Sequence, residues 1–117
     1  MKVTKMEGCG NDFVMVEMNE TTNWDLSELS KRLCDRHYGI GADGAIFVRR
    51  DPLEFTYYNA DGSYSSFCGN GMRCFAKYCI EKSIVHDNEF VVKCNQWNVL
   101  CETEGDKVSV YIPSVEY

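Results

Sequence analysis

The stretch from residue 59 to residue 79 constrains this chain most, because a turn, a glycine-rich loop and a helix follow one another in it. It reads NADGSYSSFCGNGMRCFAKYC. The segment from Asn59 to Gly62 predicts a tight turn, since Asp-Gly tolerates the positive φ that such turns require. A helix with one buried face is predicted over residues 70–82. Its apolar residues recur at helical spacing: Met72, Phe75, Ala76, Cys79 and Ile80.

Cys68 lies where the glycine-rich loop becomes the start of the predicted helix. Gly69 and Gly71 have no Cβ, so the backbone can approach a ligand closely. The first turn of a helix carries unpaired N–H groups and the positive end of the helix dipole, and both favour a carboxylate or a thiolate. A free cysteine is most often a small buried hydrophobic residue. A core cysteine needs no glycines beside it, however, whereas a backbone cradle for an anion does.

The overall composition is typical of one globular domain. The chain has 117 residues, of which 44% are hydrophobic and 26% are charged, and this length suffices to bury a core. The net charge of −6 argues against a nucleic-acid-binding surface. No run is long and apolar enough to span a membrane, and the first residues contain no apolar signal segment. We therefore expect a cytoplasmic protein that binds neither nucleic acid nor membrane.

Seven cysteines raise the alternative of a zinc protein. The sequence has no Cys-x-x-Cys pair, and its only imidazole ligands are His37 and His86. Zinc sites usually combine two closely spaced pairs of ligands. We therefore expect no metal, and free thiols in a reducing compartment. Apart from Cys68, the cysteines are expected to pack as small hydrophobic residues, with Cys79 on the apolar face of the predicted helix and Cys74 off it.

Strands and helices are predicted along the rest of the chain. A first helix is expected at about 25–36, capped by Asn23 or Asp25 and followed by Gly39 just past its end. A glycine-rich bend near the N-terminus lets Asn11 project from a strand–loop–strand unit. The expected strands lie at residues 3–6, 13–18, 45–49, 54–58, 90–94, 99–103 and 107–112, with turns at 95–98 and 104–106.

Residues 39–44 read GIGADG and formally match the G-x-G-x-x-G fingerprint of dinucleotide-binding proteins. That fingerprint follows a strand and opens a helix, because the helix N-terminus binds the phosphates. Here the segment follows a predicted helix and precedes a predicted strand. We therefore reject nucleotide binding for this segment.

Three motifs, taken together, closely resemble the diaminopimelate epimerase family. They are KMEGCGNDF at 5–13, RHYGIGADG at 36–44, and NADG at 59–62 followed by CGNGMRCFA at 68–76. The motifs occur in the family's order and at its approximate spacing, and the resemblance covers essentially the whole chain. Family members have a second, similar half, to which nothing here corresponds. We therefore expect residues 1–117 to form a single domain equivalent to the N-terminal half of a two-domain epimerase.

The resemblance implies an α+β fold, in which a mixed, barrel-like β-sheet curls around a central helix. It also implies an isomerase that interconverts LL- and meso-diaminopimelate in lysine and cell-wall precursor biosynthesis, without pyridoxal phosphate, any other cofactor or a metal. Inverting the α-carbon means removing a weakly acidic proton from one face and returning one to the other, so two groups of opposite protonation must flank it. Fixed donors around the carboxylate must stabilise the developing charge. In this family the two groups are a thiolate and a thiol.

By this resemblance, Cys68 is one of the two catalytic cysteines. The implied substrate-binding residues are Asn11, Asn59, Gly69, Asn70 and Gly71. Local sequence alone also allows Asn11 to be an ordinary turn residue and Asn59 to be a cap on the following turn. The second cysteine belongs to the family's other half, so the isolated chain is expected to bind weakly and to racemise negligibly. The expected partners are an amino-acid substrate and a C-terminal epimerase half, and a homodimer is left open.

The chain departs from the family pattern at two positions near the implied site. Members often have histidine at the position of Glu7. Some have glutamine at the position of Gly44 and contact the substrate with its side chain. The loop that contains Gly44 is implied to border the substrate pocket. Any contact at Gly44 must therefore come from the backbone.

Other functions compatible with the resemblance remain alternatives. Racemases of histidine and proline and an isomerase of phenazine biosynthesis belong to the same superfamily. A non-catalytic binding domain with the same fold is an alternative of a different class, and the zinc protein is another.

Overall fold

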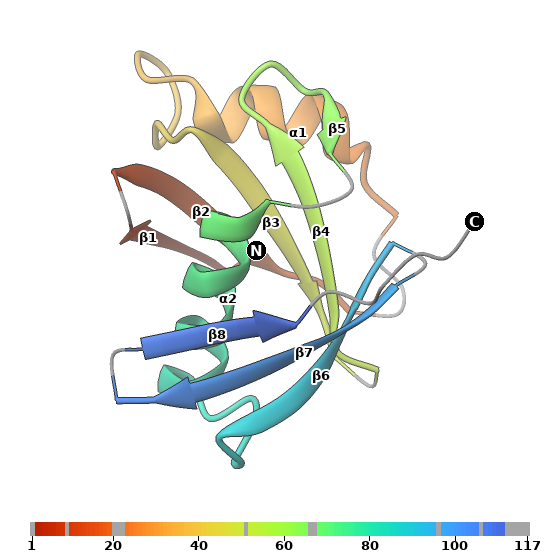
Figure 1. The fold of residues 1–117 in the computed structure, drawn as a ribbon. Helices are drawn as coiled ribbons and strands as arrows, with labels where there is room; N and C mark the ends of the chain where they lie inside the picture. The colour runs from red at the N-terminus through yellow and green to blue at the C-terminus, as the bar shows by residue number, and fades with distance from the viewer. Residues whose placement is uncertain are drawn as a thin grey trace, which may run out of the picture.

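The structure is a computed structural model, and it describes residues 2–8, 10–19, 23–50, 52–65, 68–95, 97–105 and 107–111. In this part of the chain, one mixed β-sheet curls around the central helix α2 (Gly69–Glu81), and a second helix, α1 (Leu26–Cys34), packs on the outside (Figure 1). The strands are β1 (Val3–Gly8), β2 (Asn11–Glu17), β3 (Gly44–Arg49), β4 (Glu54–Asn59), β5 (Tyr64–Ser65), β6 (Glu89–Cys94), β7 (Trp97–Glu104) and β8 (Lys107–Tyr111).

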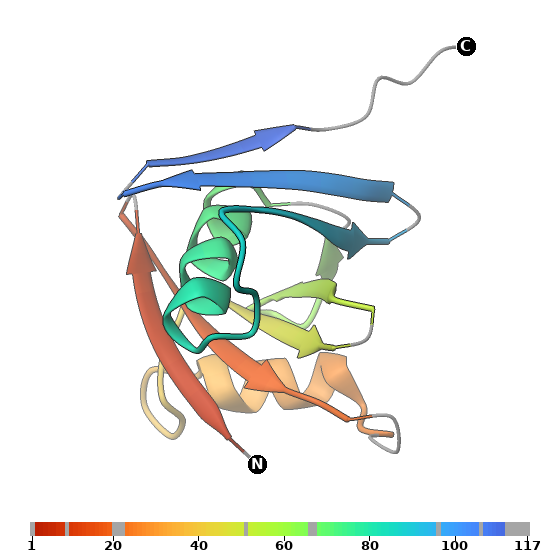
Figure 2. The same ribbon diagram turned by 90° about the horizontal axis from the view of Figure 1, so that it is seen from below.

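The sheet contains two parallel pairs, and each pair explains the place of one helix. The strand order is β1-β2-β3-β4-β6-β7-β8, with β5 added to β4, and only β2–β3 and β4–β6 are parallel. A parallel pair needs a crossover connection, usually through a helix. Helix α1 lies in the connection from β2 to β3, and α2 lies in the connection from β4 to β6. Figure 2 shows the sheet bending around α2 from β1 to β8, which confirms the expected mixed sheet around a central helix.

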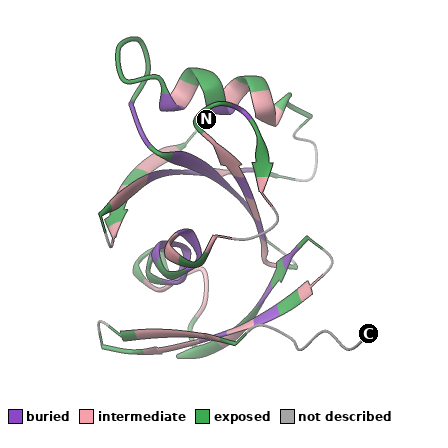
Figure 3. Cartoon of the chain, turned by 45° about the horizontal axis from the view of Figure 1, so that its top comes forward, coloured by how far each residue is buried: buried purple, intermediate pink, exposed green. Residues whose placement is uncertain are grey.

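Two cores lie on opposite faces of the same strands: an inner core around α2 and an outer core between the sheet and α1. Figure 3 shows α1, the strands β2 to β4, α2 and the strands β6 to β8 as successive layers. Side chains alternate between the faces of a strand, so Ile46 packs toward α2 and Phe47 packs toward α1. Residues 44–48 of β3 are all buried for this reason. The central strand is therefore covered on both faces, as is typical beside a parallel pairing.

Helix α1 ends at Cys34, two residues before the predicted end at residue 36. Asp35 has an extended conformation (φ −62°, ψ 123°), and its carboxylate accepts the N–H groups of His37 (2.8 Å) and Tyr38 (3.0 Å). A short polar side chain that binds the backbone in this way competes with the helix. The predicted end was wrong because this turn forms in place of the last residues of the predicted helix.

The start of α1 agrees with the prediction, but the glycine near its end has another role. Asp25 caps the helix by accepting the Glu28 N–H at 3.2 Å. Gly39 lies in a loop that folds back on the helix, and its N–H donates to Asp35 O at 2.9 Å. A Cβ at Gly39 would lie 2.1 Å from Arg32 O. The position therefore requires glycine for close backbone approach, not for a cap directly past the helix end.

Helix α2 agrees with its predicted bounds of 70–82 to within one residue, but it is more buried than predicted. Cys74, which the spacing places off the apolar face, is buried in the inner core, as is Tyr78. The edge strands β1 and β8 both contact the helix and cover additional sides of it. The prediction of one buried face was therefore too narrow. The exposed residues of α2 form a single row: Gly69, Arg73, Lys77 and Glu81.

All seven predicted strands are present, with ends that differ by one or two residues. Asn11 is the first residue of β2 and pairs with Gly8 in an antiparallel hairpin, so it lies at a strand end. The two later turns contain positive φ angles, at Asn95 (58°) and Gly105 (59°). The predicted residue 112 of the last strand, and Gln96 and Asp106 of the turns, lie outside the described residues.

No helix within the described ranges combines the length and the apolar character needed to cross a membrane.

Candidate active site

Cys68 caps the N-terminus of α2 with its sulfur. Its backbone is extended (φ −141°, ψ 113°), and Sγ accepts the N–H of Gly71 at 3.4 Å. Serine, aspartate or asparagine usually fills this position. The side chain is partly buried against the inner core. A Cβ at Gly71 would lie 3.3 Å from Cys68 Sγ and 3.3 Å from Ile46 Cδ1, so glycine lets the thiol and the core approach each other.

Asn11 and Asn70 meet, although they are 59 residues apart in the sequence. Asn70 Nδ2 donates to Asn11 Oδ1 at 2.8 Å, and this bond is partly buried. Arg73 Nη1 donates to Asn70 Oδ1 at 3.2 Å from the next turn of α2. The structure thereby brings two of the expected substrate-binding residues to the helix start that carries Cys68.

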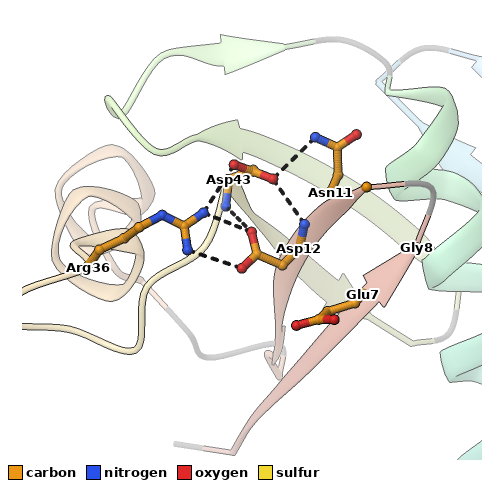
Figure 4. Close-up of a pocket in the computed structure, with 7 residues that line it drawn as sticks. Glu7, Gly8, Asn11, Asp12, Arg36 and Asp43 are labelled. Carbon is orange, nitrogen blue, oxygen red and sulfur yellow. Dashed lines mark hydrogen bonds and ion pairs between the residues drawn. The ribbon is translucent and has the colours of Figure 1, made fainter.

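An ion-pair network holds the other side of Asn11. Arg36 makes a two-pronged contact with Asp12, Nη1 to Oδ2 at 3.2 Å and Nη2 to Oδ1 at 3.0 Å, and Nη2 also donates to Asp43 Oδ1 at 3.1 Å. Asp43 Oδ2 accepts the Asp12 N–H at 3.0 Å and Asn11 Nδ2 at 3.2 Å. Figure 4 shows these bonds converging between the loop after α1 and the start of β2. The network ties Asn11 to a rigid group of charges.

The network also keeps Asp12 ionised. Hydrogen bonds from Arg36 hold the pKa of the Asp12 carboxyl well below its usual range, while burial opposes this effect. Lys5 Nζ, 3.3 Å from Asp12 Oδ2, acts in the same direction as Arg36. Two-pronged guanidinium–carboxylate contacts are among the stronger hydrogen bonds in proteins and fix relative orientation.

A polar pocket of about 530 Å³ opens beside this network. Figure 4 shows Glu7 on the β1 side of the pocket, apart from the bonded group. The walls offer carboxylates that attract an ammonium group, and the amide of Asn11 offers a donor that attracts a carboxylate. An amino acid carries both groups. The residues that line the pocket are Glu7, Gly8, Gly10, Asn11, Asp12, Arg36 and Asp43.

Asn59 uses its side chain within its own turn. Its Nδ2 donates to Ser63 Oγ at 3.0 Å, and its N–H donates to Ser63 O at 2.8 Å. Gly62 has a φ of 88°, as the turn prediction requires. The structure does not bring this side chain to the Asn11–Asn70 pair. The turn is nevertheless bound to the same loop, because the Ala60 N–H donates to Asp43 O at 3.1 Å.

Gly44 leaves room for the ring of Tyr57. A Cβ at Gly44 would lie 2.4 Å from Tyr57 Oη. The rings of Tyr57 and Phe13 meet edge to face, with centroids 5.9 Å apart, although β3 lies between their strands. Two strands with a third strand between them lie roughly 9–10 Å apart. The Phe13–Tyr57 contact across β3 therefore depends on the absence of a side chain at Gly44. Burial raises the pKa of Tyr57 to about 12.

The other described cysteines are buried, in agreement with the prediction that they pack in the core. Burial raises the pKa of Cys79 to about 12 and that of Cys34, Cys94 and Cys101 to about 11. Cys9 lies outside the described residues. Within the described ranges, no group of three or more His, Cys, Asp or Glu side chains is placed to hold a metal ion.

Sequence reasoning missed four charged residues that organise the site: Asp12, Arg36, Asp43 and Arg73. All four lie within the three motifs quoted above, and Asp12 and Asp43 directly adjoin Asn11 and Gly44. This proximity to the predicted site residues was the only indication of their role that the sequence offered. Which side chains meet across 24 to 32 residues depends on strand register, which the local sequence does not contain.

Comparison with protein-family models gives a match to the family described as diaminopimelate epimerase, over residues 3–116. A diaminopimelate epimerase of Caldanaerobacter subterraneus subsp. tengcongensis is 49% identical over 96 residues, which are 80% of this chain and 34% of the relative. One of Clostridium perfringens is 42% identical over 114 residues, 92% of this chain and 42% of the relative. The chain thus spans about a third to two fifths of the length of these relatives.

Solved structures with the same fold include proteins of another family. The Bacillus anthracis phenazine biosynthesis protein of the PhzF family has a TM-score of 0.69 at 13% identity, covering 96% of this chain and 40% of that one. The corresponding protein of Enterococcus faecalis has a TM-score of 0.66 at 8% identity, covering 82% and 35%. At these identities the likeness establishes the fold alone.

Proposed function

We propose that this chain, which belongs to the diaminopimelate epimerase family, carries one half of a two-base active site for the epimerisation of diaminopimelate. Cys68 is the base or acid of this half. The observation that carries the proposal is the place of its thiol, which caps α2 beside two interacting amides, Asn11 and Asn70. Lysine and cell-wall precursor biosynthesis and a cytoplasmic location follow from the same proposal.

The start of α2 supplies the groups that such a reaction needs for the α-carboxylate. The Gly71 N–H is bound to Cys68 Sγ and the Met72 N–H to Cys68 O. The N–H groups of Gly69 and Asn70 have no partner among the described residues, as expected for the first turn of a helix. A carboxylate bound there would stabilise the negative charge that develops when the α-proton leaves. The nearby thiol would exchange that proton.

Asn11 and the pocket beside it are assigned to the same substrate. Asn11 lies between the amide of Asn70 and the carboxylate of Asp43, and it lines the 530 Å³ pocket. The carboxylates of Glu7 and Asp12 on the pocket wall suit the ammonium group of an amino acid. Asn59 shapes its own turn with its side-chain amide, and the Ala60 N–H of that turn binds Asp43 O.

The second base is assigned to a C-terminal half like that of the relatives. Inversion needs a proton donor on the opposite face of the α-carbon. Cys74 and Cys79 follow Cys68 on the same helix and are buried, so neither can flank a substrate from the other side. The isolated chain is therefore expected to exchange protons negligibly. We assign the second base to residues that resemble the part of the relatives that this chain does not span.

The test is exchange of the α-proton of LL-diaminopimelate into solvent deuterium, measured by NMR. The chain is assayed by itself and after mixing with the C-terminal half of a family member. We expect exchange only in the mixture, and loss of exchange in Cys68→Ser. Cys34→Ala is the matched control, because Cys34 lies in the outer core and should leave exchange intact.

Other outcomes separate the alternatives. Exchange by the chain without a partner would refute the assignment of the second base. Exchange with histidine or proline but not with diaminopimelate would point to a racemase of those amino acids. No exchange in a folded and associated mixture would refute the enzymatic proposal and favour a non-catalytic binding domain.

A further inference from the structure

The orientation of a side-chain amide is set by its partners, because its two ends have nearly the same shape. One end carries an oxygen that accepts, and the other carries two N–H groups that donate. Asn11 and Asn70 adjoin the thiol that the proposed function makes catalytic. Which end each amide turns toward a substrate carboxylate decides whether it attracts or repels that carboxylate.

Asp43 fixes the orientation of Asn11. A carboxylate at neutral pH can only accept hydrogen bonds. Its Oδ2 lies 3.2 Å from Asn11 Nδ2, while its Oδ1 accepts from Arg36 at 3.1 Å. Rotating the Asn11 amide by half a turn would place its oxygen, which carries partial negative charge, about 3.2 Å from the carboxylate oxygen Oδ2 of Asp43. The N–H end of Asn11 must therefore face Asp43.

The orientation of Asn70 follows from that of Asn11. With its nitrogen toward Asp43, Asn11 presents its oxygen to Asn70, and that oxygen can only accept. Asn70 must therefore donate through Nδ2, which lies 2.8 Å away. The oxygen of Asn70 is then left for Arg73, whose Nη1 lies 3.2 Å from it and can only donate. A carboxylate at one end and a guanidinium at the other impose the same direction on every bond.

We propose that Asp43 is a positioning residue for the substrate carboxylate, acting through this amide relay (Asp43, Asn11, Asn70 and Arg73). Each amide has two N–H groups and uses one in the relay. Among the described residues the other has no partner, and we assign it to a ligand. These donors add to the Gly69 and Asn70 N–H groups, which have no partner among the described residues. The inference rests on the proposed function for its substrate, but the relay itself is a property of this chain.

The decisive variant is Asp43→Asn, which has nearly the same shape but can donate as well as accept. The carboxylate anchor of the relay is then lost, and only Arg73 still imposes a direction. The matched control is Asp35→Asn, the same change in the same loop, at a carboxylate whose hydrogen bonds with described residues lie within its own turn. Should Asp43→Asn fail to fold, Asp43→Ser carries the same test, because a hydroxyl also both donates and accepts.

The first measurement uses the chain by itself and follows the side-chain NH₂ signals of Asn11 and Asn70 by ¹⁵N–¹H NMR. We expect Asp43→Asn to shift both pairs of signals, including those of Asn70, which does not contact residue 43. Asp35→Asn should shift neither. Unchanged Asn70 signals in a folded Asp43→Asn variant would overturn the relay.

The second measurement is proton exchange from LL-diaminopimelate in the mixture with a C-terminal half. We expect Asp43→Asn to raise KM by about 10-fold, the scale of a lost hydrogen bond to a charged group. A purely structural defect would lower the active fraction, and so kcat, without raising KM. An unchanged KM would overturn the positioning role. If the wild-type mixture exchanges no proton, the proposed function fails, and the NMR signals still decide the relay.

Discussion

Each described helix has a cysteine at one end, and the two thiols differ in their surroundings. Cys34 is the last residue of α1 and is buried in the outer core. Burial raises its pKa to about 11, and the charge of Asp12 acts in the same direction. Cys68 precedes α2, is only partly buried and accepts an N–H of the first turn. One thiol is buried and held protonated, and the other is partly exposed.

The helix dipole reinforces this difference. The C-terminal end of a helix carries partial negative charge, which disfavours a thiolate, and the N-terminal end carries partial positive charge, which favours it. Seven cysteines in 117 residues therefore say little about chemistry until each is placed on an element. The first two predictions below compare Cys34 with Cys68 directly, the third tests the burial of Cys34, and the fourth tests the cap that Cys68 forms.

The largest expected difference is in alkylation by iodoacetamide at pH 8. Cys34 should react at least about 100-fold more slowly than Cys68, because a thiol with a pKa of about 11 is almost wholly protonated and is also shielded. Mass spectrometry of the separated peptides measures both rates in one sample. Unfolding in urea is the control and should make the rates similar. Equal rates in the folded protein would contradict the contrast.

The second prediction concerns stability. Cys34→Ser should lower the free energy of unfolding by about 1–3 kcal/mol, because it places a hydroxyl in an apolar core. Cys68→Ser should change it by less than about 1 kcal/mol, since serine is a preferred N-cap. Urea denaturation of both variants measures the difference. A larger loss for Cys68→Ser would mean that its thiol is important mainly for packing.

The third prediction is a loss of stability at alkaline pH. The pKa of Cys34 is raised from 9.0 to about 11 in the folded state, so its contribution is fully present below pH 9. It is lost as the pH rises toward 11, by about 1 kcal/mol per pH unit. Cys34→Ala should show a shallower decline of unfolding free energy between pH 9 and 11. Identical slopes in urea titrations of the two proteins would refute this account.

The smallest expected effect concerns the two caps. Asp25→Ala should cost about 1 kcal/mol, because the carboxylate accepts the Glu28 N–H at 3.2 Å. Cys68→Ala should cost a few tenths of a kcal/mol, because sulfur is a weak acceptor and its contact with Gly71 is long, at 3.4 Å. Thermal unfolding of the two variants compares them. Equal costs would indicate that the sulfur caps α2 as strongly as oxygen caps α1.

Local features could be predicted from neighbouring residues. The extent of α2 follows from apolar residues spaced three and four apart. The turn after Asn59 follows from Asp-Gly, whose glycine has the positive φ that was expected. The cap at Asp25 is local for the same reason. In each case the interacting groups are within a few residues of each other, so their encounter does not depend on the rest of the fold.

The expected site could be predicted only in part. The resemblance to a family pointed to Cys68, Asn11 and Asn70, and the structure places these three together. The side chain of Asn59 lies within its own turn, as the local alternative had allowed. The roles of these residues in binding and catalysis stay predictions until exchange is measured.

Long-range order was decided by the tertiary structure. Cys74 is buried because β1 and β8 close on α2, and Arg36 pairs with Asp12 and Asp43 because the loop after α1 returns to the start of β2. The parallel pairings β2–β3 and β4–β6 bring these segments together. Spacing along the chain specifies which face of an element is apolar. Which elements meet, and in what register, depends on the packing of the whole sheet around one helix.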